Sequence, residues 1–155
     1  MDTVSAQERA LLEAFLDVQR AKIAGLLDDV DEEQARARLV PSLTTVLGLV
    51  KHAVFVEQVW IHGRVADVGR EDLGLVDTVD ESFALTDDDT VASVGEAFAA
   101  ACARSREILA EHDLDETFDW RGTPVNLRWI LAHMVAELAQ HAGHEDILVE
   151  QVLAG

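Results

Sequence analysis

The sequence has little of several residue types, and each shortage excludes a class of protein. It contains a single cysteine, Cys102, so no disulfide can form within the chain, and a reducing compartment is expected. Only 12 Lys and Arg residues stand against 30 Asp and Glu residues, and a formal net charge of −18 repels a nucleic acid backbone. The first nine residues lack the basic and apolar regions of a secretory signal. We therefore expect a cytoplasmic protein that binds no nucleic acid.

The sequence also lacks an apolar run that is long enough to cross a membrane. Its most apolar stretch, residues 46–60, is interrupted by Lys51, His52 and Glu57, whereas a spanning helix needs about 20 mostly apolar residues. The hydrophobic content of 49% is instead sufficient for one core in a chain of this length. The sequence thus predicts one domain over residues 1–155 that makes no membrane contact.

Apolar residues recur at helical spacing along most of the chain, and no strand of useful length is expected. Asp87 or Asp88 is placed to cap the third long helix, and Asn126 to cap the last one. Four long helices are typical of a four-helix bundle, in which metal and cofactor sites lie between facing helices. The sequence therefore predicts an all-α fold with long helices at Ala6–Leu27, Leu43–Val65, Asp89–His112 and Asn126 to nearly Gly155, and a short one at Asp31–Arg38.

Two segments lack helical periodicity. Residues 67–88 contain two glycines and many acids, which predicts a long crossover loop that acts as a lid or as a simple strap. Residues 113–125 contain Gly122 and Pro124 and are typical of a turn. We expect His62, before the first segment, and His112, before the second, to be exposed.

The last helix carries polar residues where a core helix has aliphatic ones. His133, Glu137 and His141 are spaced four apart, so they form one stripe, and His144 extends it by a step of three. Glu137 and His141 can direct an oxygen and a nitrogen to one point, and His52, in an otherwise apolar helix, is the natural third ligand. Two imidazoles and a carboxylate suit Zn²⁺ first, with Ni²⁺ or Fe²⁺ as alternatives.

Simpler interpretations of these residues stay open. A Glu and a His one turn apart are often a solvated surface pair, and a lone helical His is often a core residue with its hydrogen bonds satisfied. Trp60, Trp120 and Trp129 are interpreted as core or pocket-wall residues. Cys102 has no neighbouring base or cation in sequence and is interpreted as a small buried residue, not a nucleophile.

Two blocks of the sequence resemble the DinB-like superfamily. More narrowly, they are similar to an actinobacterial branch related to the N-terminal domain of mycothiol-dependent maleylpyruvate isomerase. The similarity is carried by residues 42–52 with Glu57 and Trp60, and by residues 125–134 with residues 137–146.

This resemblance implies a four-helix bundle in up-down-down-up order that holds a divalent metal with His52, Glu137 and His141. It further implies a low-molecular-weight thiol of the mycothiol type as cosubstrate, transferred to a small electrophile. His144 and His133 would then handle protons. The chain ends soon after its last helix, so maleylpyruvate isomerisation, which uses an additional C-terminal domain in the isomerase, is not expected.

Residues at the start of the last helix are the candidates for binding this cosubstrate. Arg128 and Trp129 are the predicted binding residues, and Arg121 also lies close enough in sequence to line the mouth of the site. Their simpler interpretation is a pair of solvated helix-end charges beside a core aromatic ring. The alternative to a transferase is a non-catalytic metal-binding or ligand-binding helical module related to stress, or a vestigial site. A homodimer that forms through an apolar helix face is also expected.

Overall fold

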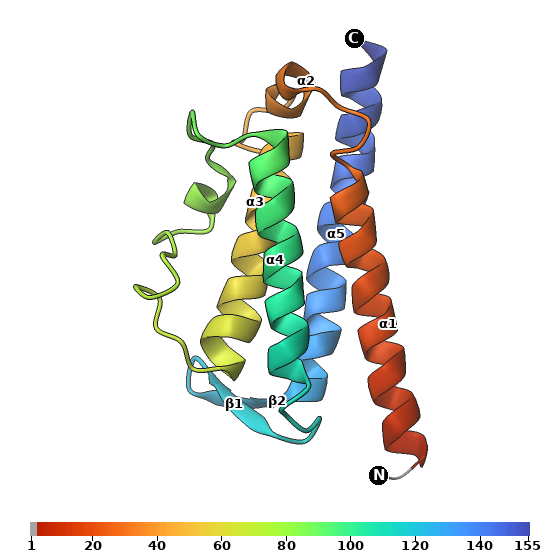
Figure 1. Ribbon diagram of the computed structural model, residues 1–155, viewed down its shortest axis with the longest axis vertical. Coiled ribbons are helices and arrows are strands. Elements are labelled where there is room, and N and C mark those ends of the chain that lie inside the picture. Colours follow the sequence, from red (N-terminus) through yellow and green to blue (C-terminus); the bar gives the residue numbers. More distant parts are fainter. Residues whose placement is uncertain (1–2) are drawn as a thin grey trace.

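The computed structural model describes residues 3–155, with side chains from residue 7 onward, and this part of the chain is mostly helical (Figure 1). It contains five α-helices, one π-helix, one 3₁₀ helix and one two-stranded antiparallel sheet. In chain order these are α1 (Thr3–Gly25), α2 (Glu32–Arg36), α3 (Val46–Glu57), the π-helix η1 (Gln58–Val65), the 3₁₀ helix η2 (Asp80–Phe83), α4 (Val91–Leu109), β1 (Thr117–Trp120), β2 (Thr123–Asn126) and α5 (Leu127–Ala154).

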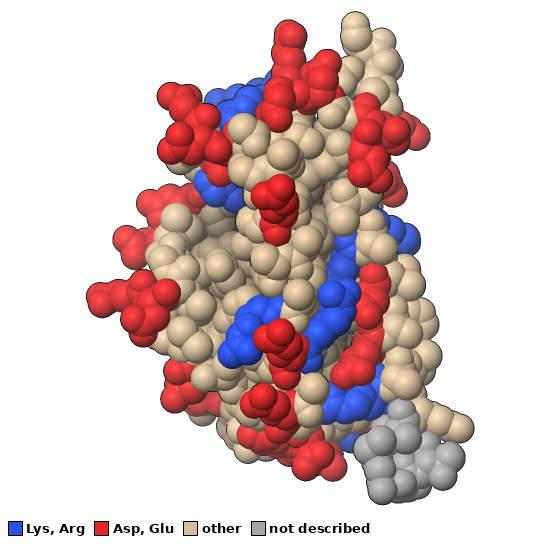
Figure 2. Space-filling view, in the orientation of Figure 1, with Lys and Arg blue, Asp and Glu red and all other residues tan. Residues whose placement is uncertain are grey.

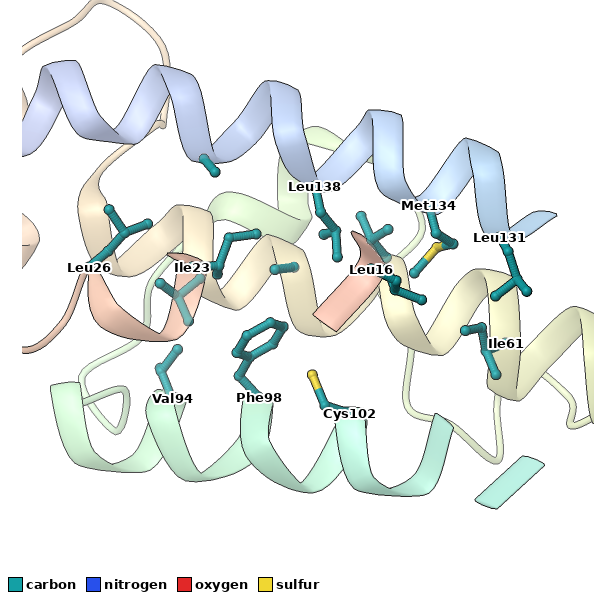
Figure 3. Close-up of a cluster of buried hydrophobic side chains, with 14 of the residues drawn as sticks. Leu16, Ile23, Leu26, Ile61, Val94, Phe98, Cys102, Leu131, Met134 and Leu138 are labelled. Atoms are coloured by element: carbon teal, nitrogen blue, oxygen red, sulfur yellow. The ribbon is translucent and has the colours of Figure 1, made fainter. Parts of the chain in front are cut away.

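The long helices lie side by side and share one apolar core (Figure 1). Helix α1 packs along α5, α3 and η1 pack along α4, and α3 also contacts α5. Figure 3 shows side chains from these helices pointing inward, among them Leu16, Phe98 and Met134, all of them almost wholly buried. Cys102 lies in the same core and burial raises the pKa of its thiol to about 12, which confirms the prediction of a buried, unreactive cysteine.

The second long helix approaches the crossover segment closely at Gly48. Its N-cap is Thr45, whose side chain accepts a hydrogen bond from the Gly48 backbone N–H at 2.9 Å. A β-carbon at Gly48 would lie only 2.6 Å from the carbonyl oxygen of Phe83 in η2. Glycine is therefore required here by the contact between the two backbones, and this contact seats η2 against α3.

The same long helix changes to π-helical geometry after Glu57. A π-helix has more residues per turn than an α-helix and is frequent at functional sites, because it shifts the direction of the following side chains. His62 on η1 is buried, at 7% exposure, and its Nε2 lies 3.1 Å from both Ser105 Oγ and the carbonyl oxygen of Ala101. The prediction that His62 is exposed was wrong, because this change of register turns the ring toward α4.

A buried ion pair joins α1 to the end of α3. Arg20 donates from Nε and Nη2 to the two carboxylate oxygens of Glu57, at 2.7 and 2.8 Å, and Ser105 Oγ donates to Glu57 at 2.7 Å. Glu57 has no exposed surface and Arg20 is only 4% exposed. Opposite charges and several hydrogen bonds compensate for the loss of hydration of both groups.

Two helix starts test the predicted caps. Thr90 caps α4 through a hydrogen bond from the Ser93 backbone N–H, so the prediction of Asp87 or Asp88 as its cap was wrong. Asn126 caps α5 as predicted, since its side chain accepts from the Trp129 backbone N–H at 2.9 Å.

The stretch at residues 113–125 was predicted to be a turn, and most of it is a β-hairpin. Strands β1 and β2 pair in antiparallel register, with Trp120 opposite Thr123. The two residues between the strands, Arg121 and Gly122, both have positive φ angles, of 53° and 81°. This is the backbone of a two-residue hairpin turn, in which glycine is favoured and arginine is not. The sequence analysis missed the hairpin because each strand has only four residues.

Acidic side chains gather along the edges and both ends of the face in Figure 2, while basic side chains form a band across its lower half. Among the described residues, arginines on α1 and α4 pair with acids on α1: Arg9 with Glu13, and both Arg20 and Arg106 with Asp17. None of the helices in the described part of the chain combines the length and the apolar character that a membrane crossing needs.

Unlike Glu57, the buried Glu145 on α5 has no partner among the described residues that compensates for its loss of hydration. Glu145 has no exposed surface, and neither of its carboxylate oxygens has a hydrogen-bond partner among the described residues. Burial, and to a lesser extent the neighbouring Asp146 carboxylate, raises the pKa of Glu145 to about 9. Its carboxyl group is therefore protonated in the folded protein at neutral pH.

Candidate metal centre

Three side chains from two helices meet beside the crossover segment. His52 comes from α3, and Glu137 and His141 come from successive turns of α5. The Nε2 atoms of the two histidines are 3.1 Å apart, and His141 Nε2 lies 3.4 Å from Glu137 Oε2. One possible ligand atom from each of the three residues lies within 4.8 Å of the others. The structure thus brings together the three ligands that were predicted from the sequence.

The tautomer of His52 follows from its contacts with η2. Ser82 Oγ donates its proton to the carbonyl oxygen of Val79, so it accepts the hydrogen bond from His52 Nδ1, at 2.7 Å. With its proton on Nδ1, His52 presents an unprotonated Nε2 toward His141. A hydrogen bond of this kind behind a ligand fixes the ring orientation and favours coordination through the other nitrogen.

The surroundings of His52 keep its imidazole neutral. The residue is 3% exposed, and its ring stacks on Phe83 with the centroids 4.1 Å apart and the planes 11° apart. Burial, together with the nearby His141, lowers the pKa of His52 to about 3. Burial also lowers the pKa of His141, although Glu137 acts in the opposite direction. Neutral imidazole is the form that binds metal ions.

The donor set fits a divalent cation. His52 Nε2 and His141 Nε2 lie 3.1 Å apart, a distance at which either a proton on His141 or a cation can link the two nitrogens. Two imidazoles and one carboxylate are ligands for Zn²⁺, Ni²⁺ and Fe²⁺, and three protein ligands leave a further coordination position open. His52, Glu137 and His141 are thus the residues of the described chain that could hold such an ion.

The three residues lie in the wall of a cleft of about 650 Å³. Helix η1 and the hairpin contribute Trp60 and Trp120, whose ring centroids are 6.0 Å apart. His133 also lines this cleft, with its Nε2 4.0 Å from Glu137 Oε1. Burial lowers the pKa of His133, with Glu137 acting against this shift and Arg64 adding to it. The cleft can therefore hold a small organic molecule between aromatic walls, beside the three candidate ligands.

Of the other predicted site residues, Arg121, which was expected at the mouth of the site, lines the cleft, whereas three others lie outside it. His144 is exposed and does not line the cleft: on the helix it keeps nearly the direction of Glu137, but it lies seven residues, or about 10 Å, farther along α5. Arg128 also lies outside the cleft, where it pairs with Glu8 of α1 and with Asp115 at 2.7 Å. Trp129 is 37% exposed and stacks on His133, with the ring planes 5° apart, so it supports this ring from outside the cleft.

Sequence reasoning missed several residues that shape the site. Ser82 and Phe83 come from a 3₁₀ helix of only four residues, and no periodicity marks them in a segment rich in acids and glycine. Arg64, near the end of the π-helix η1, and Arg70, at the start of the crossover segment, also line the cleft. The one sequence feature that could have drawn attention to these two arginines is that basic residues are scarce in this chain.

Two solved structures share this fold over nearly their whole length. The crystal structure of a conserved protein from Enterococcus faecalis aligns with a TM-score of 0.71 at 17% identity, covering 94% of this chain and 97% of that one. A DinB-like protein from Bacillus cereus ATCC 10987 aligns with a TM-score of 0.67 at 18% identity, covering 90% of this chain and 91% of that one. These likenesses support the DinB-like fold that the sequence predicted.

Comparison with curated protein sequences gave no match. The model of one protein family, described as mycothiol-S-transferase, matches residues 11–154. The chain therefore belongs to the mycothiol-S-transferase family and, as its sequence predicted, to the DinB-like superfamily.

Proposed function

We propose that this protein is a metal-dependent S-transferase that joins a mycothiol-type thiol to a small electrophile. The observation that carries the proposal is the convergence of His52, Glu137 and His141 in the wall of a cleft. Membership of the mycothiol-S-transferase family supports a thiol as the cosubstrate. The proposed ion is Zn²⁺, with Ni²⁺ and Fe²⁺ as alternatives, because this mixed nitrogen and oxygen set suits all three.

Each part of the site has a role in this proposal. A bound divalent cation lowers the pKa of a coordinated thiol and so supplies thiolate at neutral pH. His133 lines the cleft beside Glu137, where its ring can accept the thiol proton. Phe83 and Trp60 hold the reactants and exclude water. The sulfur electron pair forms the new carbon–sulfur bond, and the leaving group departs from the same carbon with the electron pair of the broken bond.

The proposal also covers the order of the helices and the oligomeric state. A four-helix bundle in up-down-down-up order is supported by Figure 1, in which α1 and α5 run upward while α3 and α4 run downward. A single domain over residues 1–155, a cytoplasmic location and a homodimer stay predictions from the sequence. The roles predicted for His144, Arg128 and Trp129 receive no support from their positions outside the cleft.

Metal content is the first test. Elemental analysis of the untagged protein is expected to give about one divalent ion per chain, and the His52→Ala, His141→Ala double variant is expected to lose it. His112→Ala is the matched control, because His112 pairs with Glu116 and does not line the cleft. If the wild type takes up no metal even after incubation with Zn²⁺ or Ni²⁺, the transferase proposal fails and a helical ligand-binding module becomes the better account.

Turnover is the second test. Loaded wild-type protein with mycothiol and 1-chloro-2,4-dinitrobenzene is expected to form the thioether and release chloride faster than the double variant under the same conditions. The His112→Ala protein is expected to match the wild type. Equal rates in the wild type and the double variant would show that the bound metal has no part in thiol transfer.

A further inference from the structure

Basic residues gather in the cleft of a chain that has few of them. Of the 12 Lys and Arg residues in the sequence, Arg64, Arg70 and Arg121 line this one cleft. They come from η1, from the crossover segment and from the hairpin turn, so their proximity is a product of the fold. The acids that line the same cleft are Glu137, which faces the two histidines, and Asp77.

None of these three guanidinium groups forms an ion pair with an acid among the described residues. Ion pairs in the described part of the chain occupy Arg9, Arg20, Lys51, Arg104, Arg106 and Arg128, but none of the three arginines of the cleft. Lys22, Arg36 and Arg38 also form no ion pair among the described residues, but none of them lines the cleft. What distinguishes the cleft is therefore that three unpaired arginines gather there in a chain with a net charge of −18. An anionic ligand would supply the missing charge.

Arg64 is held in place by two contacts, and one nitrogen of its guanidinium group has no hydrogen-bond partner among the described residues. Its Nε donates to the carbonyl oxygen of Asp119 at 3.1 Å, and its guanidinium lies 4.0 Å above the ring of Trp60. Its Nη1 is buried and has no hydrogen-bond partner among the described residues. A buried donor without a partner is costly, so a ligand that accepts a hydrogen bond here gains more than one at an exposed arginine.

Arg121 brings a second positive charge close to the first. Burial lowers the pKa of Arg64 and the positive charge of Arg121 lowers it further, although Asp119 acts in the opposite direction. Arg121 sits at the tip of the hairpin with a φ of 53°, a backbone conformation that arginine rarely adopts. The Asp119 carboxylate accepts a hydrogen bond from the Gly122 backbone N–H at 3.3 Å, so this carboxylate is bound to the hairpin turn.

We infer that Arg64, Arg121 and Arg70 form a subsite for a carboxylate group on the electrophile of the proposed transferase. Arginine guanidinium groups match the planar, two-oxygen geometry of a carboxylate. The nearby rings of Trp60 and Trp120 suit an aromatic or unsaturated body attached to that carboxylate. The inference rests on the proposed function for the identity of the reactants, whereas the anion subsite itself is independent of metal.

Direct binding tests the subsite without any turnover. The probes are benzoate and benzamide, which have nearly the same shape and differ in charge, and the readout is the fluorescence of Trp60 and Trp120. Benzoate is expected to bind at least about tenfold more tightly than benzamide, since a hydrogen bond to a charged group contributes about 1.5–3 kcal/mol. Equal affinities, or no binding of benzoate, would overturn the inference.

Variants assign the preference to the subsite. Arg64→Gln and Arg121→Gln are each expected to weaken benzoate binding about tenfold or more and to leave benzamide unchanged. Arg38→Gln is the matched control, because it removes the same charge from an exposed arginine outside the cleft. A loss in Arg38→Gln as large as in Arg64→Gln would show a general charge effect and refute the subsite.

The metal-site double variant separates this inference from the proposed function. The His52→Ala, His141→Ala protein is expected to keep the benzoate preference, so a failed metal test leaves the subsite standing, and a failed benzoate test leaves the metal site standing. Kinetics then test the assignment to the electrophile. Arg121→Gln is expected to raise KM for 4-(chloromethyl)benzoate and not for 4-(chloromethyl)benzamide, and an equal rise for both would overturn the assignment.

Discussion

Replacing Glu145 by Gln is expected to stabilise the protein in a way that grows with pH. The folded state keeps the Glu145 carboxyl group protonated up to a pKa of about 9, whereas in the unfolded chain it ionises near its ordinary value of 4.5. Between these two values the folded state binds the extra proton, so the free energy of unfolding of the wild type falls as the pH rises. A glutamine at this position binds no proton in either state and carries no such loss.

The size of the effect follows from the distance between the two pKa values. One pH unit corresponds to about 1.4 kcal/mol, so the wild type loses about 3 kcal/mol relative to Glu145→Gln between pH 4.5 and pH 7. For a chain of this length that difference is about 6–12 °C in melting temperature. Below pH 4.5 the two proteins are expected to differ little, because Glu145 is then protonated in both states.

Urea denaturation followed by circular dichroism at pH 5 and at pH 7 measures this difference directly. The control is Glu150→Gln, which removes the same charge from an exposed position on the same helix. A stability gap for Glu145→Gln that is the same at both pH values would refute the reasoning, because it would show that the carboxyl group does not stay protonated on folding. A pH-dependent gap of equal size in Glu150→Gln would refute it as well, since net charge alone would then be the cause.

Three further variants test other parts of the fold. Arg20→Met leaves the buried Glu57 carboxylate without its counter-charge and is expected to lower the free energy of unfolding, measured by urea denaturation, by about 3–5 kcal/mol. Replacing both residues by apolar ones is expected to recover most of this loss. An Arg20→Met protein as stable as the wild type would contradict the ion pair. Ser82→Ala removes the acceptor behind His52 and is expected to weaken Zn²⁺ binding about 10- to 100-fold in a competition titration with a chelator, at nearly unchanged stability. Asn126→Ala removes the cap of α5 and is expected to cost about 1 kcal/mol, and an unchanged melting temperature would contradict the cap.

The helices and the three candidate ligands could be predicted from the sequence because both depend on local spacing. The period of the apolar residues placed the long helices to within a few residues, and the spacing of four placed Glu137 and His141 on one side of α5. The position of His52 in an otherwise apolar helix suggested it as the third ligand, and the resemblance to DinB-like proteins supported this choice. Neither argument depends on how the segments between the long helices fold.

The remainder of the site depends on contacts that local spacing does not encode. Ser82 and Phe83 reach His52 because Gly48 lets the crossover segment approach α3, and nothing near residue 82 signals that contact. Arg64 and Arg121 are placed by a π-helical turn and by a hairpin of very short strands, although Arg121 was expected at the mouth of the site from its nearness in sequence to the last helix. His144 was misjudged for a similar reason, since its angle on the helix places it on the stripe but does not tell how far along α5 the cleft extends.

The contact between η2 and His52 couples the candidate metal site thermodynamically to a segment distant from it in sequence. Ser82 and Phe83 hold His52 in its coordinating orientation, so an ion that binds through His52 also favours the conformation of η2 in which these contacts exist. By mass action, occupancy then suppresses local opening of this segment. Hydrogen exchange at the backbone amides of residues 80–83 would consequently report occupancy of the site, and would do so before any substrate is known.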